Sequence, residues 1–159
     1  MSSPIIYHYT TGDRFLRIVA AQAILPATAH VAPPEIPAVW LSSTPVWEPS
    51  ATKGVIEDGI RRQASLAELI GLCGCLVRIE IDPAAVRLLE PDSFRDALCI
   101  PLDVHDRLIA AGLEMGADPS DWSAVAGPVP LTAFRRIEFS VEANPPNWIP
   151  WPGIRLRAS

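Results

Sequence analysis

Two segments of the chain alternate apolar and polar side chains, which is the pattern of a strand with one buried face. They are residues 75–82, CLVRIEID, and residues 135–143, RRIEFSVEA. In the second segment the apolar side chains, which we expect to point inward, are Ile137, Phe139 and Val141. Its polar side chains, which we expect to face solvent, are Glu138, Ser140 and Glu142.

Shorter β-rich segments predict the remaining strands. Residues 4–10 and residues 38–43, AVWLSS, are apolar and rich in residues that favour extended structure. Near the C-terminus, NWIPW at 147–151 and IRLRA at 154–158 are candidates for closing strands.

The first strand is followed by a segment with helical periodicity. Apolar side chains recur at helical spacing between residues 11 and 25. Thr11 or Asp13 can cap the N-terminus of this helix, and we expect Pro26 to end it.

Three later segments also predict helices. Residues 49–63 have a weak helical pattern. Residues 65–74 begin with Ser65 and carry Glu68 three positions later, which is a capping box. Residues 93–116 are helical in their second half, up to the closing glycine.

The order of these elements indicates the fold class. Short strands are separated by long irregular connections, and no regular alternation of strand and helix appears. This order favours an α+β domain over a doubly wound parallel sheet. The 17 prolines fall in clusters between elements, and no linker divides the chain, so we expect residues 1–159 to form a single domain.

Composition and charge exclude several classes of protein. With 49% hydrophobic and 19% charged residues, the chain has a globular composition and not a disordered one. A net charge of −5 argues against a general nucleic-acid binder. No apolar run is long enough to cross a membrane, and the first residues lack the pattern of a secretory signal, which favours the cytoplasm.

Nothing in the sequence predicts a metal site. Cys73 and Cys75 are too close for a zinc-ligand pair, and no second pair exists. Together with Cys99 they make an odd number, which suits a reducing compartment, and we expect all three to be small buried residues. The three histidines have no metal-type spacing, and the motifs of phosphate loops and serine hydrolases are absent.

The first strand places a histidine where an apolar side chain would pack more easily. In IIYHYTT, residues 5–11, the period of two puts Ile6, His8 and Thr10 on one face and Tyr7 and Tyr9 on the other. A polar side chain on a buried face needs a hydrogen-bond partner or a ligand. A second stretch, VWLSSTPVWEPSATK, sets a cluster of hydroxyl groups at the end of a strand, where binding sites are often built.

These two stretches together resemble the ADP-ribosyltransferase superfamily. The segment YHYTT opens a helix that ends with AILP, and VWLSSTPVWE follows it. The similarity is to the branch that begins with His, which includes diphtheria-toxin-like enzymes, poly-ADP-ribose polymerases and small bacterial toxins. The resemblance implies a split, strongly bent pair of small sheets, flanked by helices, with NAD as substrate in a central cleft.

The resemblance also implies roles for individual residues. His8 would hydrogen-bond a ribose and the nicotinamide amide, with Tyr9 and Thr10 beside it on the strand. The hydroxyl groups that would brace the nicotinamide and the catalytic acid belong to Ser42, Ser43 and Thr44. The aromatic side chains that would stack on nicotinamide are Trp47, the nearest, and Trp40. The family acid lies on a late strand, where this chain offers Glu138 in the middle of the strand and Glu142 at its end.

The chain departs from the family pattern in two ways. No tyrosine lies on the second strand or in the segment after it, so either Trp47 replaces it or the nicotinamide stacks differently. The late strand also lacks the Gln/Glu-x-Glu pair with which some transferases position a protein side chain. This departure argues against arginine as the acceptor.

Three hypotheses for function follow. The first is an NAD-dependent enzyme that transfers ADP-ribose or hydrolyses NAD; as a toxin or effector it would have a macromolecular acceptor, protein or nucleic acid, and a cognate antitoxin or immunity protein. The second is a catalytically inactive member that serves as a nucleotide-binding or protein-interaction module. The third is an unrelated α+β interaction domain, for which NPPNWIPWPG would provide the partner surface or merely a lid on the core.

The candidate residues also have alternative roles in structure alone. His8 would then be a core histidine bonded to a backbone carbonyl. Glu138 would be a strand residue paired with Arg136 or Arg78. Glu48, close to the start of a predicted helix, would only complement the helix dipole.

Overall fold

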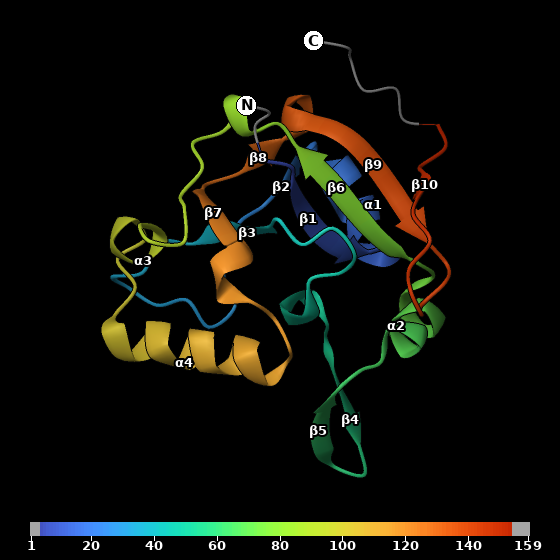
Figure 1. The fold of residues 1–159 in the computed structure, drawn as a ribbon, viewed down its shortest axis with the longest axis horizontal. Helices are drawn as coiled ribbons and strands as arrows, with labels where there is room; N and C mark the ends of the chain where they lie inside the picture. Colours follow the sequence, from blue (N-terminus) through green and yellow to red (C-terminus); the bar gives the residue numbers. More distant parts are fainter. Residues whose placement is uncertain (1–3, 154–159) are drawn as a thin grey trace.

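A six-stranded antiparallel sheet forms the centre of the computed structural model, which describes residues 4–153. The strand order is β10-β9-β6-β1-β3-β7 (Figure 1). The strands are β1 Ile6–Thr11, β3 Ala38–Ser42, β6 Leu76–Ile81, β7 Trp122–Ala126, β9 Phe134–Ser140 and β10 Ile149–Pro150. With the helices around it, this sheet confirms the α+β class.

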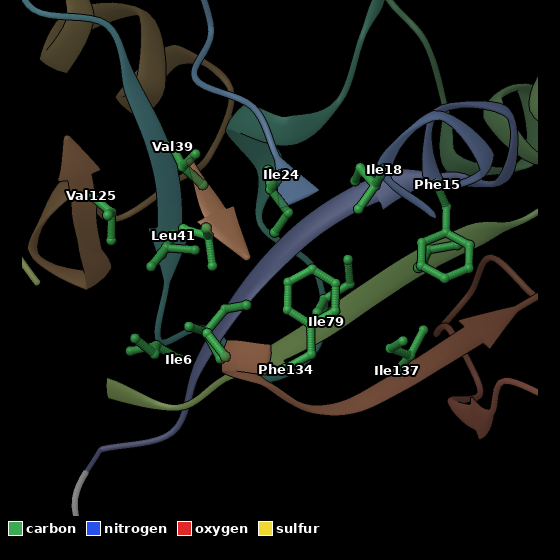
Figure 2. Close-up of a cluster of buried hydrophobic side chains, with 14 of the residues drawn as sticks. Ile6, Phe15, Ile18, Ile24, Val39, Leu41, Ile79, Val125, Phe134 and Ile137 are labelled. Atoms are coloured by element: carbon green, nitrogen blue, oxygen red, sulfur yellow. The ribbon is translucent and has the colours of Figure 1, made fainter. Parts of the chain in front are cut away.

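The sheet divides between its strands β1 and β3. Strand β1 pairs with β6 along its whole length, and β3 pairs with β7 along its whole length. In contrast, β1 and β3 are paired at one position, Tyr7 opposite Ser42. Figure 2 shows the two strands meeting near Ile6 and separating toward Ile24 and Val39. The central sheet therefore consists of two parts that touch at one residue pair.

Helices and two small sheets surround this framework. The helices are α1 Gly12–Ala21, α2 Leu66–Cys73, α3 Phe94–Ala97 and α4 Leu102–Glu114. The two-stranded sheets are β2 Ala23–Ile24 with β8 Val129–Pro130, and β4 Gly54–Glu57 with β5 Ile60–Gln63. Single 3-10 turns lie at η1 Pro49–Ala51, η2 Pro83–Ala85, η3 Pro119–Asp121 and η4 Leu131–Ala133.

Separate apolar clusters cover the two faces of the sheet. On one face, Phe15 and Ile18 of α1 join Ile79 of β6 and Ile137 of β9 in the largest cluster (Figure 2). Phe15 is completely buried, and removing such a ring costs about 3–5 kcal/mol. Burial of this face holds α1 against the strands that line the split.

The opposite face carries the tyrosines of β1. Tyr7 and Tyr9 pack with Trp47 and with Leu69 of α2, whereas Ile6 belongs to the cluster under α1. The predicted alternation of β1 is therefore confirmed.

Most predicted strands and one helix start are confirmed. The segments 38–43 and 75–82 contain β3 and β6, and the segments 4–10 and 135–143 contain β1 and β9 except for one residue each, Thr11 and Phe134. The capping box is present, since Ser65 accepts from the Glu68 backbone and Glu68 accepts from the Ser65 backbone. The helix in the second half of 93–116 is α4, and 147–151 contains β10. The candidate strand 154–158 lies outside the described residues.

The predicted helix over 49–63 is wrong. This segment forms η1 and then the β4–β5 hairpin, which projects from the body of the molecule (Figure 1). The turn residues Asp58 and Gly59 both have positive φ, 50° and 78°. An Asp-Gly pair with both residues in this region makes the tight turn that favours a hairpin.

The predicted faces of residues 135–143 also need correction. Glu138 and Ser140, expected to face solvent, are 7% and 0% exposed, whereas Val141 is 60% exposed. The polar face of β9 is buried because Trp148 and the segment after β3 pack on that side of the sheet. Val141 is exposed because the strand ends at Ser140.

Two smaller predictions are also wrong. Helix α1 ends at Ala21, where Gln22 takes a left-handed conformation, and not at Pro26, because the next residues form β2. Cys75 is buried, but Cys73 is half-buried and Cys99 is exposed. None of the helices within residues 4–153 is long and apolar enough to cross a membrane.

Candidate functional site

A cavity of about 790 Å³ opens where β1 and β3 separate. Its walls come from β1, α1, residues 23–29, β3 and the segment 48–53, with Leu108 of α4 and Trp122 of β7. This volume is in the range of small-molecule sites, about 300–1,000 Å³. The cavity therefore occupies the gap left by the incomplete pairing of the sheet.

The His8 side chain hydrogen-bonds β3 at a position where the backbone of β1 no longer reaches it. Alternate residues of a strand present their backbone groups to the same edge. The Ala38 carbonyl accepts from the Ala27 N–H on this edge, and Ser42 pairs with Tyr7 there. Trp40, midway between them, is paired with Ala124 of β7 on the other side of β3 but has no strand partner on this edge, because β1 has moved away. Its carbonyl accepts from His8 Nδ1 at 3.0 Å.

This bond determines which ring nitrogen of His8 remains for a ligand. A carbonyl only accepts, so Nδ1 carries the proton. Burial lowers the pKa of His8, opposed by the bond to Trp40 and reinforced by Arg14 and Lys53, so the ring is neutral at neutral pH. No described group bonds Nε2, which is thus an acceptor for a hydroxyl or N–H group.

A second polar group in the cavity wall is the carboxylate of Glu48. It is 5% exposed and accepts four hydrogen bonds: Ser42 Oγ at 2.7 Å, Ser50 Oγ at 2.6 Å, Ser50 N at 3.1 Å and Trp122 Nε1 at 3.1 Å. No cation pairs with Glu48 in the part of the chain that is described. Burial of a carboxylate is costly unless other groups compensate for it, and here four hydrogen bonds do so in place of a cation.

The framework around Glu48 is closely fitted. Ser42 and Trp122 are opposite each other on β3 and β7, so both donors come from one point of the sheet. Helix α4 approaches this point at Gly112, where an added Cβ would lie 2.3 Å from the Trp122 ring. Glu48 also caps η1, as expected for a residue at a helix start, by accepting from the Ser50 N–H.

Cations line another wall of the same cavity. Arg14 and Arg17 are one turn apart on α1, and Lys53 follows η1. Lys53 Nζ donates to Thr11 Oγ1 at 3.0 Å, and burial followed by repulsion from Arg14 lowers the pKa of Lys53. None of the three cations forms an ion pair with another residue in 4–153. On a chain of net charge −5, this wall suits an anionic ligand.

The structure brings together five of the residues expected at the site. Those that line the cavity are His8, Tyr9, Thr10, Trp40 and Ser42.

The other expected site residues lie elsewhere. Ser43 and Thr44 donate to the Asp121 carboxylate at 2.7 and 3.0 Å, which ties the end of β3 to η3. Trp47 is buried edge-on against Tyr9, with ring centroids 5.2 Å apart, and donates to Thr52.

Neither late-strand glutamate lines the cavity. Glu138 pairs with Arg78 at 2.7 Å and, more distantly, with Arg136 at 4.0 Å, the two structural partners expected for it. Glu142 lies beyond the end of β9, is exposed, and accepts from Asn147 Nδ2 at 3.3 Å. The catalytic role of a late-strand glutamate stays a prediction, and the carboxylate in the cavity belongs to Glu48.

Sequence reasoning missed Glu48 as a candidate for chemistry, and also the cations of α1 and Lys53. One signal was available for Glu48, since it is the single acidic residue in a stretch of apolar and hydroxyl side chains after a strand. No comparable signal marks Lys53 or the arginines, because their convergence depends on how α1 and residues 48–53 meet around the split.

Comparisons with known proteins do not assign a family. No protein-family model matches this chain, and searches of curated proteins and of solved structures find no match. No group of three or more His, Cys, Asp or Glu side chains within the described residues is arranged to hold a metal ion.

Proposed function

We propose that this protein binds NAD in the cavity between β1 and β3 and cleaves the bond between nicotinamide and ribose. The ADP-ribose is transferred to an acceptor or to water. The observation that carries the proposal is the Glu48 carboxylate: it is buried, has no cation partner among residues 4–153, and shares one cavity with the cations Arg14, Arg17 and Lys53.

The carboxylate suits the charge that develops in this reaction. As the C1′–N bond breaks, its electron pair goes to the nicotinamide nitrogen and the ribose gains oxocarbenium character. A carboxylate near the ribose stabilises that positive charge, as in glycoside hydrolysis. The acceptor oxygen or nitrogen then bonds to C1′ and releases a proton. The four donors around Glu48 hold the carboxylate in place beforehand.

The rest of the cavity complements the rest of NAD. The cationic wall of Arg14, Arg17 and Lys53 would hold the diphosphate. His8 Nε2 would accept from a ribose hydroxyl or from the carboxamide N–H. Trp40 adds an aromatic wall, fixed edge-on against Phe94 with ring centroids 5.1 Å apart.

The shape of the sheet supports an ADP-ribosyltransferase-like fold. In that fold two small bent sheets enclose NAD between them, and here the β10-β9-β6-β1 and β3-β7 parts separate beside the cavity. The acceptor would be a protein or a nucleic acid if the enzyme acts as a toxin or effector, with an antitoxin or immunity protein as its natural inhibitor.

Nicotinamide release tests the proposal. Wild-type protein incubated with NAD should release nicotinamide, measured by chromatography, and Glu48→Gln should lower the rate by about 10²–10³, the loss expected for one preorganised electrostatic group. Glu114→Gln, at the exposed glutamate that ends α4, is the matched control and should keep the wild-type rate. Wild-type protein that is stabilised by NAD but releases no nicotinamide would instead be an inactive nucleotide-binding module.

A further inference from the structure

Three successive backbone carbonyls after β3 each accept a hydrogen bond from a side chain. Tyr9 Oη donates to the carbonyl of residue 44, and Arg78 Nη1 to the carbonyl of residue 45. Trp148 Nε1 donates to the carbonyl of residue 46 at 3.0 Å. Side chains from β1, β6 and the segment before β10 thus hold one irregular stretch of backbone.

The donors belong to one ordered row across the sheet. Tyr9, Arg78 and Glu138 are direct neighbours on β1, β6 and β9. Arg78 Nε donates to Glu138 at 2.7 Å, and both side chains are largely buried, 13% and 9% exposed. The guanidinium carbon lies 4.8 Å from the ring centroids of both Tyr7 and Trp148. These contacts restrain the Arg78 side chain from several sides.

The stretch that these donors hold leads directly to the cavity carboxylate. Two residues after the carbonyl of residue 46 comes Glu48. Between them, Trp47 is fixed by Tyr9 and by its bond to Thr52 at 2.9 Å. A shift of residues 44–46 would move Glu48 relative to Ser42 and Trp122, whose positions are set by β3 and β7.

We propose that Arg78 is a positioning residue for Glu48, acting through the carbonyl of residue 45, and that Glu138 orients Arg78. The catalytic part of this inference rests on the proposed function. In this inference the Arg78–Glu138 ion pair contributes to the reaction without contacting the substrate. Burial raises the pKa of Tyr9, which keeps its hydroxyl a donor to the same stretch.

Two conservative variants separate this role from direct catalysis. In Glu138→Gln the amide oxygen still accepts from Arg78 Nε, so Arg78 keeps its position. The kcat for nicotinamide release should therefore stay within about threefold of wild type. In Arg78→Lys the donor to residue 45 is lost, and kcat should fall about tenfold or more through misplacement of Glu48, with KM for NAD unchanged. Arg135→Lys, which alters the exposed pair with Asp82, is the matched control and should change neither constant.

A structural readout tests the same inference without NAD. The indole N–H of Trp122 donates to Glu48, so its proton resonance, assigned with Trp122→Phe, reports the position of the carboxylate. We expect this resonance to move in Arg78→Lys and to stay in place in Glu138→Gln. Tyr9→Phe removes only one hydroxyl donor and should move the Trp122 resonance in the same direction as Arg78→Lys. This variant keeps the inference testable if Arg78→Lys does not fold.

The outcomes distinguish the inference from the proposed function. Unchanged kcat and an unmoved Trp122 resonance in Arg78→Lys would overturn the positioning role alone. Loss of activity in Glu138→Gln equal to that in Glu48→Gln would overturn it by making Glu138 a catalytic carboxylate. If wild-type protein releases no nicotinamide but the Trp122 resonance responds as expected, the positioning of Glu48 holds and the proposed reaction fails.

Discussion

Replacement of Glu48 by glutamine removes the buried charge but keeps the shape of the side chain. In the same orientation, the amide oxygen replaces Oε1 and still accepts from Ser50 and from Trp122 Nε1. The amide nitrogen replaces Oε2, and the Ser42 hydroxyl can turn from donor to acceptor. The contacts around the residue persist, so we expect the free energy of unfolding to change by no more than about 1 kcal/mol.

Replacement of Glu48 by alanine has a different result. It leaves two buried donors, Ser42 Oγ and Trp122 Nε1, without their acceptor, while exposed Ser50 can bond to water. Each unsatisfied buried group costs about 1–3 kcal/mol, so the free energy of unfolding should fall by about 2–6 kcal/mol. Both variants should lose nicotinamide release, because neither has a carboxylate.

Urea unfolding followed by tryptophan fluorescence measures both changes at neutral pH. A glutamine variant that is as stable as wild type but inactive would show that the negative charge of Glu48 is needed for the reaction and not for stability. A glutamine variant as unstable as the alanine variant would refute the reasoning, since it would show that the negative charge itself holds the cavity wall together.

Three further predictions concern the framework, the cationic wall and the histidine. Gly112→Ala should lower the melting temperature through overpacking of about 1–3 kcal/mol against Trp122, whereas Gly71→Ala, where an added Cβ meets nothing, should not. Lys53→Met should weaken NAD binding about tenfold and flatten its salt dependence in titrations from low to high ionic strength, and equal salt dependence in both proteins would contradict the anionic subsite. Because burial lowers the pKa of His8 below 6.5, the unfolded chain takes up this proton first as the pH falls below about 6.5. Wild type should therefore lose stability there relative to His8→Gln in urea titrations at several pH values, and parallel pH curves would be inconsistent with a buried neutral ring.

The strands were predictable because their signals are local. Residues 75–82 and 135–143 alternate apolar and polar side chains because successive side chains of a strand point to opposite faces of the sheet. The capping box at Ser65 is contained within four residues. The hairpin after Lys53 was predictable in principle, since the Asp58-Gly59 pair marks a tight turn. The weak helical periodicity of residues 49–63 competes with this turn signal in the sequence.

The candidate site was less predictable because it depends on contacts between distant segments. His8 is predictable as a site residue because a polar residue stands out on an apolar strand face. Its partner is not predictable, because the Trp40 carbonyl is free to accept a hydrogen bond from His8 only where β1 and β3 separate. The burial of Glu138 results from its pairing with Arg78 and from the packing of Trp148 and residues 44–47 on the same face of the sheet. Alternation along a single strand does not reveal whether a second face is covered.

Titration calorimetry of NAD into the purified protein tests the central claim most directly. NAD should bind wild type, should bind Glu48→Gln with similar affinity, and should bind Lys53→Met about tenfold more weakly, the loss of one charge-assisted contact. That pattern would show that the cationic wall of the cavity contributes to NAD binding and that the Glu48 carboxylate does not, as expected for a residue that acts in the chemical step. The absence of any binding heat for wild type at millimolar NAD would contradict the claim.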